Sequence, residues 1–329
     1  MPEIQDKKFL SYDEQVKYLN NDKGILTTRR DKIHLIRYGY FTLVNGYKDA
    51  FVLNTDNERN HTYFPETKLK HFVYIKQFDE NLSNILLKYL KRIEEEIRST
   101  FMYKLDEYIL PHALTWSDLD IVDNNAVSQK MKDCITKIKD DPDFKDSNLN
   151  YLNHYRNNYD SVPSWVMIKC VKFWHVEELI ECSPSSVKKF LANMYNIESR
   201  DSLRNNQDFR ILKNQLKTIR KIRNECAHNE RVFDYLKPSG RVITKYHEHL
   251  GGKYRYNRDL RIIDLLIHVK YFLPHEEYEL LIMDIYKLID KLKNKINEHA
   301  FSRIKNNIGL RQPADLLRLL ELRHEINYP

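Results

Sequence analysis

The sequence predicts an all-α protein, and three observations carry this prediction. The chain of 329 residues has only 7 glycines, where average usage would give about 23. It also has only 10 prolines, and a β-sandwich or barrel needs more residues of both kinds for its turns. Between Glu66 and Asp106, apolar residues recur at steps of three or four, which is typical of one face of a long helix.

Local signals place the first helices. Ser11 followed three residues later by Glu14 has the form of a capping box and predicts a helix through about residue 19. Thr28 can cap a second helix. The aromatic segment 37–47 follows, and we expect a buried helix with close contacts at its two glycines.

The middle of the chain is organised around the long helix over 66–106, which could reach roughly 60 Å. Residues 107–125 look irregular, and 126–139 is expected to be helical. Residues 140–162 are polar and predict a loop. The apolar segment 163–174 predicts a helix with both of its tryptophans in the core.

The C-terminal half contains further helices. Ser183 is expected to cap one of them, with Pro184 at its first position. A helix over 208–228 turns Leu212, Leu216, Ile219 and Ile222 toward a core. A long basic loop over 230–258 follows, and Pro274 and Pro313 each open a final helix.

Several classes of protein are disfavoured. No GxGxxG or GxxxxGK motif occurs, and every apolar run is shorter than the roughly 18 residues that a membrane span needs. The polar first eight residues lack the apolar segment of a secretory signal. The four cysteines show no CxxC pair and no metal spacing, and Cys226 is expected to be a buried apolar residue. We therefore expect a cytoplasmic protein with reduced thiols and no metal or other cofactor.

The positive charge is concentrated in one stretch. The chain carries a net charge of +7, whereas residues 203–261 hold 15 basic and 6 acidic side chains, a net of +9. Tyrosines are interleaved with these cations, which is typical of a surface for single-stranded or looped RNA. The alternative is a solvated loop on a moderately basic protein.

One short segment combines groups suited to RNA cleavage. Arg223 and His228 form an Arg-x4-His pair at the predicted end of a helix. An arginine can hold a phosphate, and a histidine can give or take a proton near neutral pH. Cleavage of RNA by its own 2′-hydroxyl needs both functions and no metal. The spacing alone is not specific, because Arg29 and His34 form a second such pair to which we assign no function.

Helix geometry limits how these residues can cooperate. Asn224 and His228 lie four apart on one face of a helix, whereas Arg223 and His228 lie about 140° apart around it. Either the helix ends at His228 and turns the imidazole, or two chains supply complementary residues to one site.

The segment Arg223-Asn-Glu-Cys-Ala-His-Asn-Glu-Arg231 resembles the signature of HEPN domains, specifically of the Abi-like (AbiD/AbiF) abortive-infection proteins. Four other segments agree with this family in order. They are Phe9–Gln15, the aromatic-glycine block Tyr38–Tyr47, the charged helix Arg92–Arg98 and the Pro-x-Trp-Val segment at 163–168. The resemblance spans about residues 9–235.

The resemblance implies an HEPN-like helical bundle with additional N- and C-terminal helices. We expect an N-terminal helical extension over 1–65, a core with the Arg-x4-His motif over 66–235, and a basic loop with C-terminal helices packed on the core over 236–329. The implied function is that of a metal-independent endoribonuclease or toxin in bacterial phage defence. The implied partners are a small structured non-coding RNA, an RNA substrate and a second copy of the chain. The alternative is a non-catalytic protein that packages such an RNA.

The family's Arg and His fall on Arg223 and His228, with Asn224 as the polar residue that orients the imidazole. This family often has a second His after the motif, where this chain has Asn229, and His228 is left as the one proton carrier. The charged helix maps onto Arg92, Glu94 and Arg98 as possible support for the site. RNA contacts are expected at Arg231, Arg241, Lys245, Lys253, Tyr254, Arg255 and Arg258.

Structural roles remain open for the same residues. Arg223 could form a salt bridge with Glu94 or Glu95 in the core. His228 could be a C-cap residue that meets the negative end of the helix dipole. The charged helix 92–98 could be a solvated face.

Overall fold

The computed structural model describes residues 9–57, 60–110, 115–116, 127–197, 207–235, 237–238, 245–250 and 259–329. Over these residues the chain is all-α, which confirms the predicted fold class. The described strands form two short antiparallel pairs, β1 (Val52–Thr55) with β2 (His61–Tyr63) and β3 (Lys237–Pro238) with β4 (Asp259–Leu260). Among the described helices, none is both long and apolar enough to cross a membrane.

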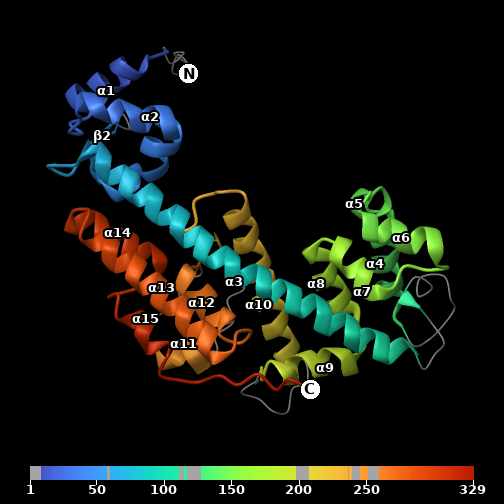
Figure 1. Ribbon diagram of the computed structural model, residues 1–329. Helices are drawn as coiled ribbons and strands as arrows, with labels where there is room; N and C mark the ends of the chain where they lie inside the picture. The colour runs from blue at the N-terminus through green and yellow to red at the C-terminus, as the bar shows by residue number, and fades with distance from the viewer. Residues whose placement is uncertain are drawn as a thin grey trace.

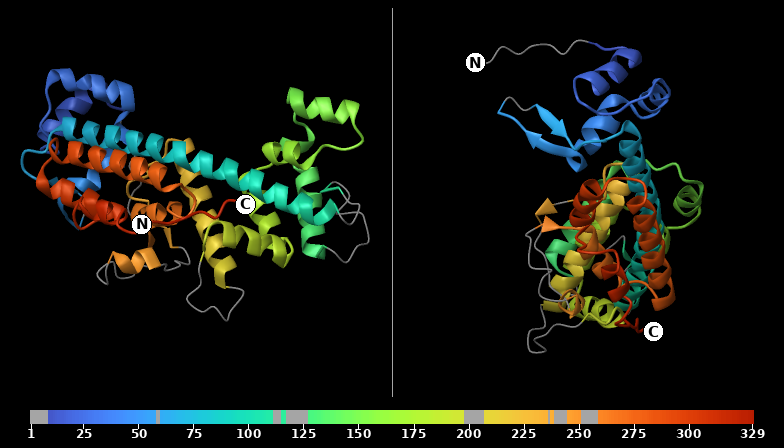
Figure 2. Two further views of the ribbon diagram at one scale, coloured as in Figure 1. Left: turned by 60° about the horizontal axis from the view of Figure 1, so that its bottom comes forward. Right: turned by 90° about the vertical axis from the view of Figure 1, so that its left-hand side faces the viewer.

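One helix of 41 residues, α3 (Leu69–Ile109), runs the length of the molecule (Figure 1). At 1.5 Å per residue it is about 61 Å long. The short helices over residues 12–50, which form an N-terminal head, pack at the first turns of α3. The helices α4 to α8 gather near the last turns of α3 (Figure 2). The predicted long helix is confirmed, shifted by about three residues toward the C-terminus.

The other helices fall into three groups around α3. The head holds α1 (Tyr12–Asn21), η1 (Arg29–Asp31), α2 (Lys32–Tyr38), η2 (Phe41–Asn45) and η3 (Lys48–Ala50). The far end holds α4 (Gln129–Asp140), α5 (Pro142–Lys145), α6 (Asn150–Asn158), α7 (Ser164–Cys170), α8 (Phe173–Cys182) and α9 (Ser185–Met194). The centre holds α10 (Gln207–Ala227), α11 (Lys245–His249), α12 (Ile262–Val269), α13 (His275–Lys293) and α15 (Asp315–Arg318), whereas α14 (Glu298–Ile308) lies beside the head and contacts η3. Both α10 and α13 pack against α3, and α10 also contacts α8, α9 and α12.

Several helix boundaries follow the local signals. Ser11 and Glu14 form the expected capping box at α1, and Pro274 is the N-cap residue of α13. The predicted helix over 208–228 is α10. The helix α14 was not expected, although Asn297 caps it by accepting a hydrogen bond from the Ala300 N–H. Gly309 ends it in the left-handed region, with φ of 100°.

The expectation for the aromatic segment 37–47 is wrong in its details. The segment is interrupted at Gly39, which has φ of 73° and ends α2, and a short π-helix follows it as η2. A Cβ added at Gly39 would meet nothing within 4 Å, so the backbone conformation and not a close contact requires glycine there. Gly46 has helical angles and only one backbone oxygen at 4.0 Å from an added Cβ. Phe41 is 78% exposed and is not a core residue.

Three expectations for the middle of the chain are also corrected. The polar stretch 140–162 contains two short helices, α5 and α6, the first capped by Asp141. The apolar stretch 163–174 breaks into α7 and α8. Trp165 is 61% exposed and Trp174 is 36% exposed, so neither lies fully in the core. Ser183 precedes the N-cap of α9, and its hydroxyl donates to the Leu179 carbonyl instead.

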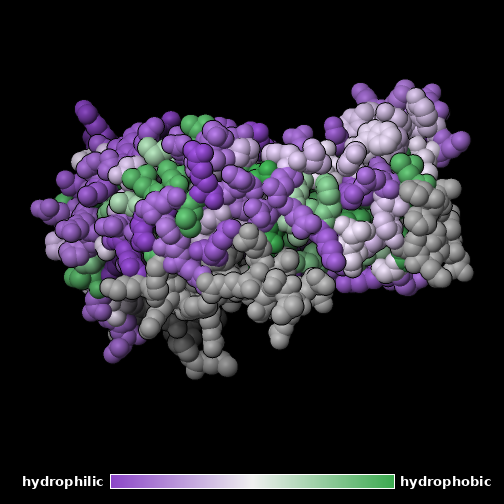
Figure 3. Space-filling view, turned by 90° about the horizontal axis from the view of Figure 1, so that it is seen from below, coloured by the Kyte–Doolittle hydropathy of each residue, from purple (hydrophilic) through white to green (hydrophobic). Residues whose placement is uncertain are grey.

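The helix α12 is buried on every side. All eight of its residues are buried, including Asp264 and His268, which share one face of the helix. At the surface, the face at the bottom of Figure 1 is mostly hydrophilic, with smaller hydrophobic patches between polar side chains (Figure 3).

The two glycines of the aromatic segment should respond oppositely to alanine. We expect Gly39→Ala to lower the free energy of unfolding by about 1–3 kcal/mol, because φ of 73° is strained for any residue with a Cβ. Gly46→Ala should raise it by about 0.5 kcal/mol, because a helical glycine mainly adds entropy to the unfolded chain. Urea unfolding followed by circular dichroism measures both. Equal losses of stability in the two variants would contradict the assignment.

Candidate functional site

A glutamate occupies the buried face of α3. Glu94 lies among the apolar residues Leu90, Ile93 and Ile97, and its side chain is only 9% exposed. A carboxylate removed from water in this way is costly unless cations and hydrogen bonds compensate it. The neighbouring helices therefore have to bring such partners to this point.

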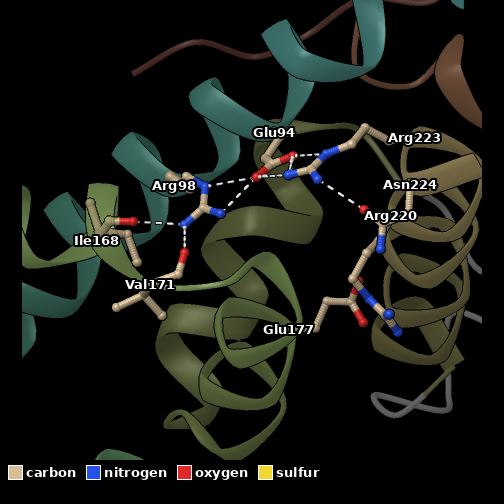
Figure 4. Close-up of polar contacts among 8 residues, drawn as sticks. All are labelled: Glu94, Arg98, Ile168, Val171, Glu177, Arg220, Arg223 and Asn224. Atoms are coloured by element: carbon tan, nitrogen blue, oxygen red, sulfur yellow. Dashed lines mark hydrogen bonds and ion pairs between the residues drawn. The ribbon is translucent and has the colours of Figure 1, made fainter. Parts of the chain in front are cut away.

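Two arginines supply the compensation (Figure 4). Arg98, one turn further along α3, donates to the Glu94 Oε1 from Nε at 3.1 Å and from Nη2 at 2.6 Å. Arg223 of α10 donates from Nε to Oε2 and from Nη2 to Oε1, both at 2.7 Å, in the paired geometry of a guanidinium facing a carboxylate. Two positive charges meet one negative charge, so this Glu94 cluster, consisting of Glu94, Arg98 and Arg223, keeps an excess of one positive charge.

Arg98 also holds the turn between α7 and α8. Its Nη1 donates to the carbonyl of Ile168 at 2.7 Å and to that of Val171 at 2.6 Å. Carbonyls at the end of a helix have no partner inside the helix, and here a side chain from α3 satisfies them. The guanidinium also lies 5.4 Å from the ring centre of Phe173, the first residue of α8. The break that splits the apolar stretch is thus fixed from outside that stretch.

Arg223 therefore forms a salt bridge with Glu94, which is the structural role that the sequence left open for it. Its Nη1 donates to the Asn224 side-chain oxygen at 2.9 Å, so Asn224 faces Arg223 and not His228. Three of the five N–H donors of this guanidinium bind described residues, and its side chain remains 26% exposed. The other two donors have no partner among the described residues.

His228 stands at the end of α10. It directly follows the last helical residue, Ala227, and its N–H donates to the Asn224 carbonyl at 3.0 Å. Asn229 then has φ of 55°, and the Glu230 N–H reaches back to the Glu225 carbonyl at 3.0 Å, which closes the helix in a Schellman-type turn. The His228 side chain is exposed, and within the described part of the chain its imidazole has no hydrogen bond or ion pair. His228 therefore follows the end of the helix, as a C-cap residue would, and still exposes its imidazole, as a proton carrier must. The two roles considered from the sequence do not exclude each other.

A second buried carboxylate anchors the chain after the motif. Asp79 of α3 accepts hydrogen bonds at Oδ1 from the N–H groups of Val232 and Phe233, at 3.0 and 2.9 Å, and at Oδ2 from the Tyr47 hydroxyl at 3.0 Å. Burial raises the pKa of Asp79. Two acidic residues of α3 thus hold the chain on either side of the motif: Glu94 binds Arg223 at its start, and Asp79 binds the backbone a few residues after its end.

Other predicted residues are placed elsewhere. Arg92 points away from the Glu94 cluster and pairs with Glu277 of α13 at 2.5 Å. Arg231 forms an ion pair with Asp234 at 2.9 Å and donates to the Gly46 carbonyl, so protein groups engage it. Lys245 is exposed at the start of α11. The predicted RNA contacts Arg241, Lys253, Tyr254, Arg255 and Arg258 lie outside the described residues.

Two hollows lie near the motif. One, of about 550 Å³, lies beside the end of α10 and is lined by Asn229, Arg231 and Asp234 together with Phe41 and Asn45 of the head. Burial raises the pKa of Asp234 to about 6. The other, of about 990 Å³, lies between α3 and α7 and is lined by Tyr103, Trp165 and three carboxylates, among other residues.

Sequence reasoning did not find Asp79 or the pair formed by Arg220 and Glu177, whose Nε and Oε1 lie 2.7 Å apart. Asp79 did carry a signal, because it falls on the apolar stripe of α3 between buried residues. Cys226, as expected, is buried, and burial raises the pKa of its thiol to about 12. Among the described residues, no group of His, Cys, Asp and Glu is arranged to hold a metal ion.

The protein thus has an all-α core that places an Arg-x4-His motif at a helix end, tied to a buried glutamate on a neighbouring helix. The model of the Abi-like protein family matches residues 33–234, and the chain belongs to this family. No curated protein and no solved structure matches the sequence.

The Glu94 cluster makes a sharp prediction about stability. Glu94→Gln should lower the free energy of unfolding by about 3 kcal/mol, because it leaves two largely buried guanidinium groups without their counter-charge. The matched control is Glu95→Gln, the same change at an exposed neighbour, which should stay within about 0.5 kcal/mol of the parent. Urea unfolding measures both. If the two variants unfold at the same urea concentration, Glu94 does not hold the site together.

Proposed function

We propose that this protein is a metal-independent endoribonuclease of the HEPN type that acts in abortive infection, a form of phage defence. Membership of the Abi-like family supports the role in defence. The observation that carries the proposed activity is the end of α10. There, the buried Glu94 holds Arg223 in a fixed position, and the exposed imidazole of His228 follows five residues later.

Each group has a chemical task. His228 removes the proton of the RNA 2′-hydroxyl or protonates the leaving 5′-oxygen, which suits an accessible imidazole near neutral pH. Arg223 stabilises the charge that develops on the phosphate through its two remaining N–H donors. The excess positive charge of the Glu94 cluster supports this task, and the fixed position of Arg223 means that little reorganisation is needed.

The geometry favours a site shared between two chains. His228 directly follows α10, and its position lies about 140° around the helix axis from Arg223. The guanidinium of Arg223 turns toward α3, while His228 is exposed. A second copy of the chain, packed with its α10 against the first, would bring the His228 of one chain toward the Arg223 of the other.

One observation favours a second candidate function, that of a non-catalytic RNA-binding protein. Glu94 and Asn224 already engage most of the Arg223 guanidinium, as they would in a purely structural role. In that case the same surface would hold a small structured RNA, and the RNA would remain bound when His228 is replaced.

Replacing the motif histidine separates these functions. We expect His228→Ala to abolish RNA cleavage without unfolding the protein, since the side chain is exposed, and we expect EDTA to have no effect. Because the 2′-oxygen is the nucleophile, products should carry a 2′,3′-cyclic phosphate and a 5′-hydroxyl, which mass spectrometry identifies. His34→Ala, in the second Arg-x4-His pair, is the matched control and should cleave normally. Cleavage that persists in His228→Ala, or that requires Mg²⁺, contradicts the proposal.

The shared site can be tested by mixing two inactive proteins. Arg223→Ala and His228→Ala chains, each inactive alone, should regain part of the cleavage rate after mixing, because a mixed dimer holds one intact pair. Each variant mixed with itself serves as the control. A strictly monomeric mass by light scattering at micromolar concentration, with no recovery on mixing, would show that the site is not shared.

A further inference from the structure

A line of cations runs along the exposed face of α10 toward the motif. Arg210, Lys213 and Lys217 are exposed, and Lys221 is half-buried two residues before Arg223. At 100° per residue, these four residues fall within an arc of about 80° around the helix. Asn224 and His228 fall within the same arc, whereas Arg223 lies outside it. The side chains are therefore one continuous row, about 27 Å long from Arg210 to His228.

The row is more positive than its neighbours can neutralise. Glu177 of α8 pairs with Arg220, and Glu181 pairs with both Lys213, at 2.7 Å, and Lys130, at 3.4 Å. Counting Arg220 and Lys130 with the row gives six cations. The acidic side chains beside them, among the described residues, are the three glutamates of α8, at positions 177, 178 and 181, and Glu225 of α10, one turn after Lys221. An excess of two positive charges remains among these described residues. Such an excess along one helix is complementary to a chain of phosphates.

An indole flanks the row. Trp174, Glu177 and Glu181 are spaced at i, i+3 and i+7 on α8 and therefore share one face of that helix. Because Glu177 and Glu181 pair with residues of α10, this face is the one turned toward the cation row. Trp174 stacks on the ring of the buried His175, with ring centres 3.5 Å apart, and is still 36% exposed. A partly exposed aromatic ring beside a row of cations is the combination that binds single-stranded nucleic acid, through phosphate contacts and base stacking.

We propose that the exposed face of α10 is the track for single-stranded RNA. Arg210, Lys213, Lys217 and Lys221 hold successive phosphates, Trp174 stacks on one base, and the strand leads to His228. This inference rests on the proposed ribonuclease function and adds to it where the substrate lies. It also moves the main RNA contacts from the basic stretch after the motif to the helix before it.

The test measures binding apart from cleavage. The probe is a fluorescent single-stranded RNA of about 12 nucleotides with 2′-O-methyl groups, which cannot be cut by its own 2′-oxygen, and the readout is anisotropy over a range of salt concentrations. The variant Lys213→Gln/Lys217→Gln/Lys221→Gln should bind more weakly. The slope of log affinity against log salt should flatten by about 2, because each lost phosphate contact on a single strand accounts for roughly 0.7. Trp174→Ala should weaken binding by roughly 5- to 150-fold.

Two matched controls exclude general effects of charge or aromatic content. Lys287→Gln/Lys291→Gln/Lys293→Gln makes the same change of charge on exposed positions of α13 and should bind like the parent. Trp165→Ala removes the other exposed indole, which lines the hollow between α3 and α7, and should also bind like the parent. Circular dichroism checks that each variant is folded.

The outcomes separate this inference from the function on which it rests. If the parent binds the probe and cuts unmodified RNA while the triple-lysine variant and Trp174→Ala bind like the parent, the track is wrong and the ribonuclease proposal stands. If these two variants lose binding but the parent cuts no RNA, the track is right and the protein is an RNA-binding module. A parent that does not bind the probe, or a Trp165→Ala variant that loses binding in place of Trp174→Ala, overturns the track.

Discussion

The architecture around the motif depends on the compensation of one buried carboxylate. Glu94 cannot be left alone in the apolar interface of α3, and the two arginines that neutralise it connect three separate parts of the chain. Through Arg98 it fixes the turn between α7 and α8, and through Arg223 it fixes how α10 crosses α3. A buried ionic cluster often adds little net stability over a well-packed apolar one. What this cluster provides is a single arrangement, because sliding either helix by one residue would separate the charges.

The parts of the fold that the sequence predicted are those that depend on near neighbours. The capping box at Ser11 and the proline before α13 act within a single turn, and the apolar stripe of α3 repeats along one helix. The motif was also found locally, since Arg223 and His228 stand out at the end of a periodic segment. The pairing of Arg223 with Glu94 was one of two alternatives for its acidic partner. Choosing between Glu94 and Glu95 needed the packing of α3, in which only Glu94 lies on the buried side.

The parts that were missed depend on residues far away in the chain. The break between α7 and α8 is stabilised by Arg98, about 70 residues earlier, and nothing within the apolar stretch itself marks it. Trp165 looked like a core residue because its neighbours are apolar, yet the short α7 buries Val166 and Met167 and turns the indole outward. The helix α12 was missed because it is only eight residues long and mostly apolar, and periodicity does not tell so short an apolar run from a buried strand. Asp79 falls on the apolar stripe of α3, but no sequence pattern displays its partners, which are two backbone N–H groups and the Tyr47 hydroxyl far away in the chain.

The unbroken length of α3 limits how proteins with this fold can change over evolution. The head, the Asp79 anchor, the Glu94 cluster and the far helices are all attached to one rigid rod at fixed angular positions. An insertion or deletion of one residue within that rod would turn everything beyond it by about 100° and shift it by about 1.5 Å. Glu94 would then face away from Arg223, or the head would face away from the segment that follows the motif. Length variation among such proteins is therefore expected in the connections between helices, whereas α3 itself can accept substitutions but not changes in length.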